Sequence, residues 1–459
     1  MMLLSQAAQE LGARMIGGDV RFAAVSTDSR KISAGDLFIA LKGENFDGSE
    51  YVALAARDGA VAALVNAASY RGNELPCPVL LVEDTRIALG KLAAFWRAQF
   101  AIPLVGLTGS NGKTTVKEML ASILREETGS TDAVLATEGN LNNDIGMPLT
   151  LLKLNAGHRY AVIEMGMNHP GEIDYLARIA RPDVALINNA SGAHLAGLGT
   201  VEAVAQAKGE IFAGLKEGGV AVINADDAYA ALWRKLAQPH RVLDFALDAE
   251  AAVGACWDVT EFGIQMEIST PQGAASVQLQ VPGAHNARNA LAAAAAALAL
   301  DIPLPVIARG LEKFTGVAGR LQHKPARNGA MLIDDTYNAN PASMRAALQV
   351  LAQATGQRIF VMGDMGELGV DAARLHGEIG AEAKRLGIQR LLALGELSSV
   401  AVREFGVGAQ HFNDIESLCV ALDGEISAGV TVLVKGSRFM KMERVVSHCI
   451  QGEEICCSH

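Results

Sequence analysis

Residues 106–115 have the composition of a loop that binds phosphate groups. They read Gly-Leu-Thr-Gly-Ser-Asn-Gly-Lys-Thr-Thr and stand between an apolar strand-like run and an amphipathic helical pattern. Glycines let backbone N–H groups close around phosphate oxygens at a helix N-terminus, Lys113 can pair with the β and γ phosphates, and Thr114 can place its hydroxyl on Mg²⁺. The alternative is a glycine turn that only caps a helix. The candidate ATP-binding residues here are Gly109, Asn111, Gly112, Lys113, Thr114 and Thr115.

Two further side chains follow apolar runs that resemble strands. Glu164 comes directly after the run 160–163, and His194 lies in the segment that follows the run 184–187. A carboxylate at the carboxyl end of a strand beside a phosphate loop is well placed for Mg²⁺, and a histidine there could approach the same point. Read singly, each has a structural alternative: a solvated strand end for Glu164, and a loop imidazole bonded to backbone for His194. Their shared topology makes both candidate metal ligands.

Lys208 lies on the apolar stripe of a predicted helix. The helical pattern runs from 201 to 212, and a rotation of about 100° per residue puts Lys208 among Val201, Val204 and Ile211. An ammonium group on an apolar face is costly. It could reach solvent, be paired with another group, or react with CO₂ to give a carbamate, which is an anion able to bind a metal. Periodicity does not choose among these three.

The elements that must position these residues alternate between strand and helix along almost the whole chain. This alternation predicts an α/β fold with largely parallel sheets. We expect three domains: residues 1–82, residues 83–313 with the phosphate loop, and residues 314–459, which begin at a glycine-containing stretch suited to a hinge. The central sheet is expected to be of the phosphate-loop type, flanked by an N-terminal α/β domain and a Rossmann-like C-terminal domain.

The third segment has strand candidates at 331–334, 358–362, 390–394 and 430–434, separated by helical stretches. This spacing predicts a small doubly wound sheet. Such sheets bind ligands beyond the carboxyl ends of their strands, where residues 335–338, 363–364 and 435–437 would lie.

The composition excludes several classes of protein. The chain has 459 residues and a formal net charge of -11, so no excess of cations is available to neutralise a nucleic acid or a membrane surface. Its six cysteines form no CxxC spacing, which favours reduced thiols over a zinc or redox site. The N-terminus lacks the features of a signal peptide, and the longest apolar run falls short of the roughly 20 residues that span a bilayer. We therefore expect a cytoplasmic protein.

Taken together, these motifs resemble the Mur ligases, and the resemblance runs through all three segments. In the first segment it is carried by residues 26–30 (Ser-Thr-Asp-Ser-Arg), 35–43 and 46–48. These look like the region with which the family recognises a UDP-sugar, and the resemblance implies that Ser26, Ser29 and Arg30 bind substrate.

In the second segment, residues 137–146 and 164–167 are similar to the family members that add a dipeptide. The resemblance implies that Thr137, Asn140 and Asn143 bind substrate, and that residues 285–289 meet the adenine, with Asn289 as the principal contact. It further implies that the metal ligands are Thr114, Glu164, His194 and Lys208, with Lys208 as the carbamylated lysine. Lys113, His194 and Lys208 are accordingly the candidate catalytic residues.

In the third segment the resemblance is carried by Gly-Arg at 319–320, by residues 334–341 and by residues 435–438. It implies that Arg320 and Asp335 contact ATP, and that Asn338, Asn340 and Ser437 lie on the peptide side. Asn and Ser also favour turns for purely local reasons, which is the alternative for these three.

The activity implied is an ATP-dependent amide ligation through an acyl-phosphate, with ATP and Mg²⁺ as cofactors. The substrates implied are two small molecules, UDP-N-acetylmuramoyl-tripeptide and D-alanyl-D-alanine, with neither nucleic acid nor membrane as partner and a monomeric chain. Two other classes compete with this interpretation: a phosphate-loop kinase and a nucleotide-dependent switch. If the protein were a kinase, the third segment would have no function. If it were a switch, the shared position of Glu164, His194 and Lys208 would be unexplained. Other Mur-type and folate polyglutamate ligases are alternatives within the family.

Overall fold

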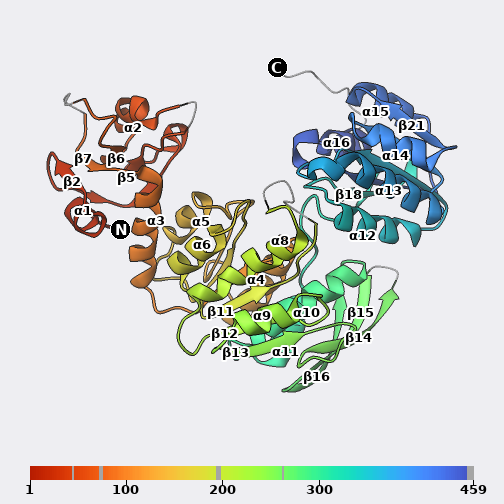
Figure 1. The fold of residues 1–459 in the computed structure, drawn as a ribbon, viewed down its shortest axis with the longest axis horizontal. Coiled ribbons are helices and arrows are strands. Elements are labelled where there is room, and N and C mark those ends of the chain that lie inside the picture. The colour runs from red at the N-terminus through yellow and green to blue at the C-terminus, as the bar shows by residue number, and fades with distance from the viewer. Residues whose placement is uncertain (44–45, 72–75, 193–197, 261–262, 452–459) are drawn as a thin grey trace.

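The computed structural model describes residues 1–43, 46–71, 76–192, 198–260 and 263–451. Three α/β regions follow one another along the chain, and the N-terminal and C-terminal regions stand on opposite sides of the central one (Figure 1). This arrangement matches the predicted fold class. Within the described ranges, none of the helices combines the length and the apolar character needed to cross a bilayer.

The N-terminal region is built on a five-stranded sheet in the order β2-β7-β6-β5-β4, in which only β2 runs antiparallel to its neighbour. Helix α3 follows this sheet and packs against α1 on one side and against α5 and α6 of the central region on the other. The elements are β1 (Met2–Leu3), α1 (Leu4–Leu11), β2 (Arg14–Ile16), β3 (Arg21–Phe22), β4 (Ala24–Ser26), η1 (Ser29–Lys31), β5 (Asp36–Ile39), η2 (Gly48–Tyr51), α2 (Val52–Arg57), β6 (Ala62–Asn66), β7 (Val79–Val82) and α3 (Thr85–Ala98).

The central region contains a six-stranded parallel sheet in the order β13-β12-β11-β8-β10-β9. Its inner strands β8, β11 and β12 are apolar runs buried on both faces, as expected when helices cover a parallel sheet, whereas the edge strand β13 is only partly buried. The elements are β8 (Leu104–Thr108), α4 (Lys113–Thr128), β9 (Val134–Ala136), α5 (Gly146–Leu151), β10 (Tyr160–Glu164), α6 (Glu172–Ala180), β11 (Val184–Ile187), α8 (Val201–Gly209), η3 (Glu210–Gly214), β12 (Val220–Asn224), α9 (Ala230–Leu236) and β13 (Arg241–Phe245).

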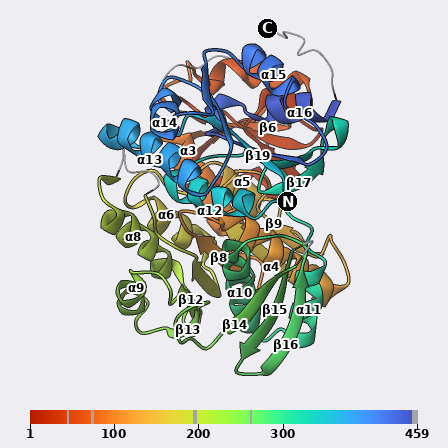
Figure 2. The same ribbon diagram turned by 90° about the vertical axis from the view of Figure 1, so that its right-hand side faces the viewer.

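A second sheet in the central region is antiparallel, with the order β14-β15-β16, and it was not predicted from the sequence. Its strands are β14 (Gly254–Thr260), β15 (Gly263–Thr270) and β16 (Gly273–Leu279), followed by α10 (Ala284–Leu298) and α11 (Leu304–Glu312). Figure 2 shows these strands and both helices gathered at one end of the molecule. Helix α10 is buried on all sides along its run of alanines, because it lies between α4 and the strands of both sheets.

The C-terminal region is a six-stranded sheet in the order β17-β18-β22-β19-β20-β21, parallel except for β17. The four strands expected from the sequence are β18, β19, β20 and β22, each within about one residue of its predicted bounds. The elements are β17 (Gln322–Pro325), η4 (Arg327–Gly329), β18 (Met331–Asp335), α12 (Pro341–Ala352), β19 (Gln357–Gly363), η5 (Gly369–Asp371), α13 (Ala372–Arg385), β20 (Arg390–Leu394), α14 (Ser398–Phe405), β21 (Ala409–Phe412), α15 (Ile415–Asp423), β22 (Val430–Lys435), η6 (Arg438–Met440) and α16 (Glu443–Gln451).

Candidate active site

A cavity of about 1230 Å³ lies between the central and C-terminal sheets. It is bordered by two sets of loops, each at the carboxyl ends of parallel strands. The loops after β8, β10 and β11 form what we call the phosphate rim, and those after β18, β19 and β22 form the C-terminal rim. Ligands of doubly wound sheets bind at such strand ends, so two sheets contribute to one site.

The phosphate loop joins the end of β8 at Thr108 to the start of α4 at Lys113. Gly112 has φ +76°, and a Cβ atom there would lie 2.4 Å from Asn289 Oδ1 and 2.7 Å from Asn188 Nδ2. Both the backbone conformation and the space therefore require glycine. The Lys113 ammonium donates to the Gly109 carbonyl at 2.8 Å, which folds the side chain back over its own loop.

Glu164 is buried at the end of β10 and engaged by two side chains of the rim. Its carboxylate accepts from Thr114 Oγ1 at 2.9 Å and from Asn142 Nδ2 at 2.7 Å. Thr137 Oγ1 accepts from the Glu164 backbone N–H at 2.9 Å and so fixes the strand end. The structure thus contradicts the alternative of a solvated strand-end carboxylate and brings Glu164 to the proposed Mg²⁺ threonine.

Arg320 links the start of the C-terminal region to the phosphate loop. Its Nη2 donates to Thr114 Oγ1 at 2.9 Å, and its guanidinium carbon lies 4.2 Å from the centroid of the Tyr337 ring. Burial lowers the pKa of Lys113, the charge of Glu164 opposes that shift, and the positive charge of Arg320 adds to it. Two cations therefore meet at one point of the rim, an arrangement suited to the charge of a triphosphate.

Lys208 lies in α8 with only 2% of its surface exposed. Its side chain therefore does not reach solvent, and that alternative from the sequence is wrong. Burial and the nearby charge of Lys113 lower the pKa of Lys208 well below its usual value. The shift is towards the neutral amine, which is the form that reacts with CO₂.

The candidate ligand His194 lies outside the described residues. Within the described ranges, no group of three or more His, Cys, Asp or Glu side chains is arranged to hold a metal ion. The oxygen ligands brought together are therefore those of Thr114 and Glu164, which do not by themselves form a closed metal site.

Asn289 belongs to a buried cluster of amides that was predicted only in part from the sequence. Asn289 Oδ1 accepts from Asn188 Nδ2 at 3.0 Å, and its own Nδ2 donates to Asn286 Oδ1 at 3.3 Å. Asn188 could have been found, because it directly follows the apolar run 184–187 at a strand's carboxyl end. His285 borders the cavity as well, and burial lowers its pKa to about 4.

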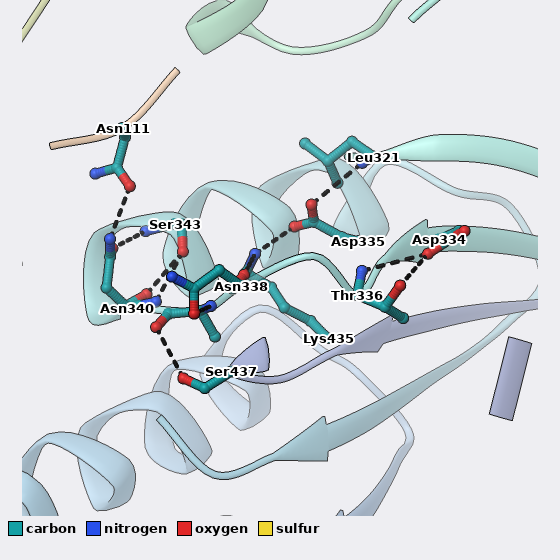
Figure 3. Close-up of polar contacts among 11 residues, drawn as sticks. Asn111, Leu321, Asp334, Asp335, Thr336, Asn338, Asn340, Ser343, Lys435 and Ser437 are labelled. Carbon is teal, nitrogen blue, oxygen red and sulfur yellow. Dashed lines mark hydrogen bonds and ion pairs between the residues drawn. The ribbon is translucent and has the colours of Figure 1, made fainter. Parts of the chain in front are cut away.

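The C-terminal rim is held together by its own side chains (Figure 3). Lys435 Nζ lies 2.6 Å from Asp335 Oδ2 and donates to the Asn338 carbonyl at 2.9 Å. Asn340 caps helix α12 through the backbone N–H of Ser343, and its Nδ2 donates to Asn111 Oδ1 of the phosphate loop at 2.7 Å.

Ser437 ties two loops of that rim. Its hydroxyl donates to the Ala339 carbonyl at 3.3 Å and accepts from the Gly366 N–H at 2.8 Å. The turn chemistry considered for Asn340 and Ser437 is therefore present, although both residues also border the cavity.

The remaining predicted substrate residues fall into two groups. Asn140 and Asn143 border the cavity, whereas Thr137 is buried behind Glu164. The structure does not bring Ser26, Ser29 and Arg30 of the N-terminal region to the site, because they do not line the cavity. Arg30 exposes 84% of its side chain and pairs with Asp28 at 2.9 Å.

This fold and this site define a phosphate-loop α/β protein in which a second parallel sheet faces the nucleotide loop across one cavity. Comparison with known families agrees with that class. Residues 21–97 match the Mur ligase family, catalytic domain; residues 107–297 match the Mur ligase middle domain; and residues 319–438 match the Mur ligase, glutamate ligase domain. The chain belongs to the Mur ligase family.

Individual relatives match nearly the whole length of the chain. A UDP-N-acetylmuramoyl-tripeptide--D-alanyl-D-alanine ligase of Escherichia coli K12 is 44% identical, over 96% of this chain and 97% of the relative. The ligase of the same name from Bacillus subtilis is 36% identical, over 93% of each.

Among solved structures, MurF from Acinetobacter baumannii has a TM-score of 0.89 and 38% identity, over 97% of this chain and 98% of that one. MurF from Thermotoga maritima in complex with ADP has a TM-score of 0.81 and 28% identity, over 92% and 96%.

Proposed function

We propose that this chain is an ATP-dependent ligase that joins D-alanyl-D-alanine to UDP-N-acetylmuramoyl-tripeptide through an acyl-phosphate, giving the pentapeptide precursor of peptidoglycan. The observation that carries the proposal is the single cavity shared by the phosphate rim and the C-terminal rim. A carboxyl group phosphorylated at the first rim would face an amine held by the second. The two substrates are those in the names of the full-length relatives.

The phosphate rim would bind ATP through Gly109, Asn111, Gly112, Lys113, Thr114 and Thr115. Asn289 would meet the adenine, while Arg320 and Asp335 would contact ATP from the C-terminal side. The ADP complex of the Thermotoga relative supports nucleotide binding in this fold. When ATP binds, Arg320 would exchange its bond to Thr114 for the phosphates.

The rim also fits Mg²⁺. Thr114 and Glu164 offer two hard oxygen ligands 2.9 Å apart beside the loop, and Mg²⁺ in nucleotide sites takes few protein ligands and several waters and phosphate oxygens. When bound, the ion would neutralise charge on the β and γ phosphates. His194 and a carbamylated Lys208 are the further ligands that we propose.

The reaction would have two steps. The terminal carboxylate of the tripeptide attacks the γ phosphorus, the bond from that phosphorus to the β–γ bridging oxygen breaks, and ADP leaves. The dipeptide amine then attacks the acyl carbon, loses a proton, and displaces inorganic phosphate as the amide forms. Lys113 would stabilise the charge that develops on the transferred group in the first step.

The substrate's ends would be held by different parts of the chain. Ser26, Ser29 and Arg30 would bind the UDP-sugar in the N-terminal region, and Thr137, Asn140 and Asn143 would support the peptide near the phosphate rim. Asn338, Asn340 and Ser437 would shape the peptide side of the C-terminal rim. Because one chain carries both rims, we propose a monomer, acting in the cytoplasm where its cysteines stay reduced.

The test is a mass measurement of the products formed from ATP, Mg²⁺, D-alanyl-D-alanine and UDP-N-acetylmuramoyl-tripeptide. We expect the nucleotide-linked pentapeptide, ADP and phosphate in equal amounts, with full turnover only when both peptide substrates are present. Phosphorylated tripeptide as the final product would identify a kinase. ATP hydrolysis independent of both peptides would identify a switch.

A further inference from the structure

A dipeptide that arrives as a zwitterion needs a cation for its carboxylate. Among the described residues that border the cavity, the arginine and lysine side chains are Arg86, Lys113, Arg288, Arg320, Lys435 and Arg438. Most of them are already committed to a partner inside the protein. The sixth, Arg438, is placed differently from the others.

Each of the first five cationic side chains has a defined partner or position. Arg86 pairs with Asp144, and Arg288 pairs with Asp226 and Asp248. Lys113 lies on the phosphate loop and Arg320 donates to Thr114 of that loop, where ATP is proposed to bind. Lys435 is almost fully buried against Asp335. These cations therefore belong to the phosphates or to the framework.

Arg438 stands directly after Ser437, which is anchored to both neighbouring loops. Its side chain is 65% exposed, and its partner Glu443, 41% exposed, lies at 3.3 Å. Exposed pairs of this kind are weak, so an incoming carboxylate can replace Glu443 at little cost. A guanidinium also presents parallel donors that match the two oxygens of a carboxylate.

The surface beside Arg438 suits a small apolar substituent. Phe439 has 63% of its surface exposed and borders the cavity. Its ring lies against Gly366, where an added Cβ would be 3.0 Å from Phe439 Cε1. The Gly366 loop is tied to Ser437 by a bond of 2.8 Å, so the aromatic wall and the guanidinium are carried by one connected framework.

We infer that Arg438 binds the terminal carboxylate of the incoming dipeptide and is a specificity-determining residue of the amine substrate, with Phe439 as the apolar wall beside it. The inference rests on the proposed function. It adds to Asn338, Asn340 and Ser437 a residue whose side chain is mostly exposed.

The experiment crosses two changes, one in the enzyme and one in the substrate. Steady-state kinetics are measured for unmodified enzyme and for Arg438→Ala, with D-alanyl-D-alanine and with its C-terminal amide, which lacks the carboxylate charge. For the free acid, Arg438→Ala should raise KM by about 10- to 100-fold, and for the amide it should change KM by less than about 3-fold. Arg438→Lys keeps the charge without the parallel donors, so its KM for the free acid should lie between those of the unmodified enzyme and Arg438→Ala.

Two controls distinguish a loss of carboxylate binding at Arg438 from a general loss of enzyme function. Arg403→Ala removes an exposed arginine of α14 that does not border the cavity, and it should leave both KM values unchanged. Trapping of the acyl-phosphate with hydroxylamine needs only ATP and the nucleotide-peptide, and it should be equal in Arg438→Ala and unmodified enzyme.

The two possible failures are distinguishable. If the unmodified enzyme gives neither hydroxamate nor pentapeptide, the proposed function is wrong. If it gives both, but Arg438→Ala raises KM equally for the acid and the amide, or for neither, the assignment of Arg438 is wrong.

Discussion

The phosphate rim and the C-terminal rim occupy the same position in two parallel sheets, yet they carry their charges differently. In the C-terminal rim the buried Lys435 is matched by Asp335 at 2.6 Å. At the phosphate rim, burial and the charge of Arg320 lower the pKa of Lys113, and Glu164 is the carboxylate that opposes this shift. The C-terminal rim thus balances one cation with one carboxylate, whereas at the phosphate rim two cations, Lys113 and the adjoining Arg320, meet the single carboxylate of Glu164.

This difference shows how one topology serves two tasks. A rim with surplus cations can bind a polyanion such as a triphosphate, because the ligand supplies the missing negative charge. A self-neutralised rim gives a rigid platform whose exposed side chains can select a small zwitterion. Substitutions that disturb each balance should therefore act on different observables: stability in the C-terminal rim and turnover in the phosphate rim.

The largest effect is expected from Lys435→Met. Removing one member of a buried ion pair leaves the other charge uncompensated, which costs about 3–5 kcal/mol. Hydrogen exchange of the β18 and β22 amides should report this loss of local stability, because Asp335 and Lys435 end those strands.

The matched control is the double variant Asp335→Asn with Lys435→Met, which removes both charges together. It should recover most of the lost stability, since no buried charge is left alone. Equal protection of the amides in the single variant and the unmodified protein would contradict the description of this rim as a balanced pair.

Lys113→Ala should reduce turnover by about 10²- to 10³-fold, because it removes a charge positioned for the transferred phosphoryl group. The fold should persist, since among the described residues the Lys113 ammonium donates its hydrogen bond to the Gly109 carbonyl of its own loop. Pentapeptide formation under saturating substrates measures the loss, and unchanged circular dichroism verifies the fold. Near-normal turnover would refute the phosphate-rim assignment.

Much of this architecture could be predicted from local patterns. Apolar runs such as 184–187 and 430–434 gave strand bounds within about a residue, because strands of covered parallel sheets must be apolar on both faces. The phosphate loop was predictable because its glycines are required by backbone geometry, as at Gly112. The antiparallel strands β14, β15 and β16 were missed, because their alternating burial gives a weak signal within a mostly α/β chain.

What could not be predicted is how side chains from distant segments pair. The bond between Arg320 and Thr114 joins positions 206 residues apart, and no sequence period encodes it. Periodicity placed Lys208 on an apolar face but could not tell burial from exposure of its amine. The domain bounds at 82 and 313 and the roles of the site residues remain predictions.

Lys208→Arg should reduce turnover by about 10-fold or more, although it keeps a positive charge, because a guanidinium does not form the carbamate. Burial lowers the pKa of Lys208, which favours the amine form that takes up CO₂. Lys208→Ala should be partly rescued by small carboxylates, and the unmodified enzyme should lose activity after prolonged removal of CO₂. An active arginine variant that keeps its fold would exclude the carbamate.

The smallest effect should come from His285, which lies between the two rims. Burial lowers its pKa from 6.5 to about 4, while the charge of Asp335 opposes that shift and the charges of Lys435 and Arg288 add to it. Between those two values the unfolded chain binds more protons at this residue than the folded chain, so the free energy of unfolding rises with pH. The contribution of His285 to the free energy of unfolding is fully present above pH 6.5 and is lost as the pH falls towards about 4.

The measurement is the free energy of unfolding of unmodified protein and of His285→Phe at several pH values across that window. The phenylalanine variant keeps an aromatic ring and does not titrate, so the difference between the two profiles isolates His285 from the other histidines. We expect the unmodified protein to lose on the order of 1–3 kcal/mol relative to the variant as the pH falls through the window. Parallel profiles would mean that His285 is solvated in the folded protein and that the two rims are not held together at this point.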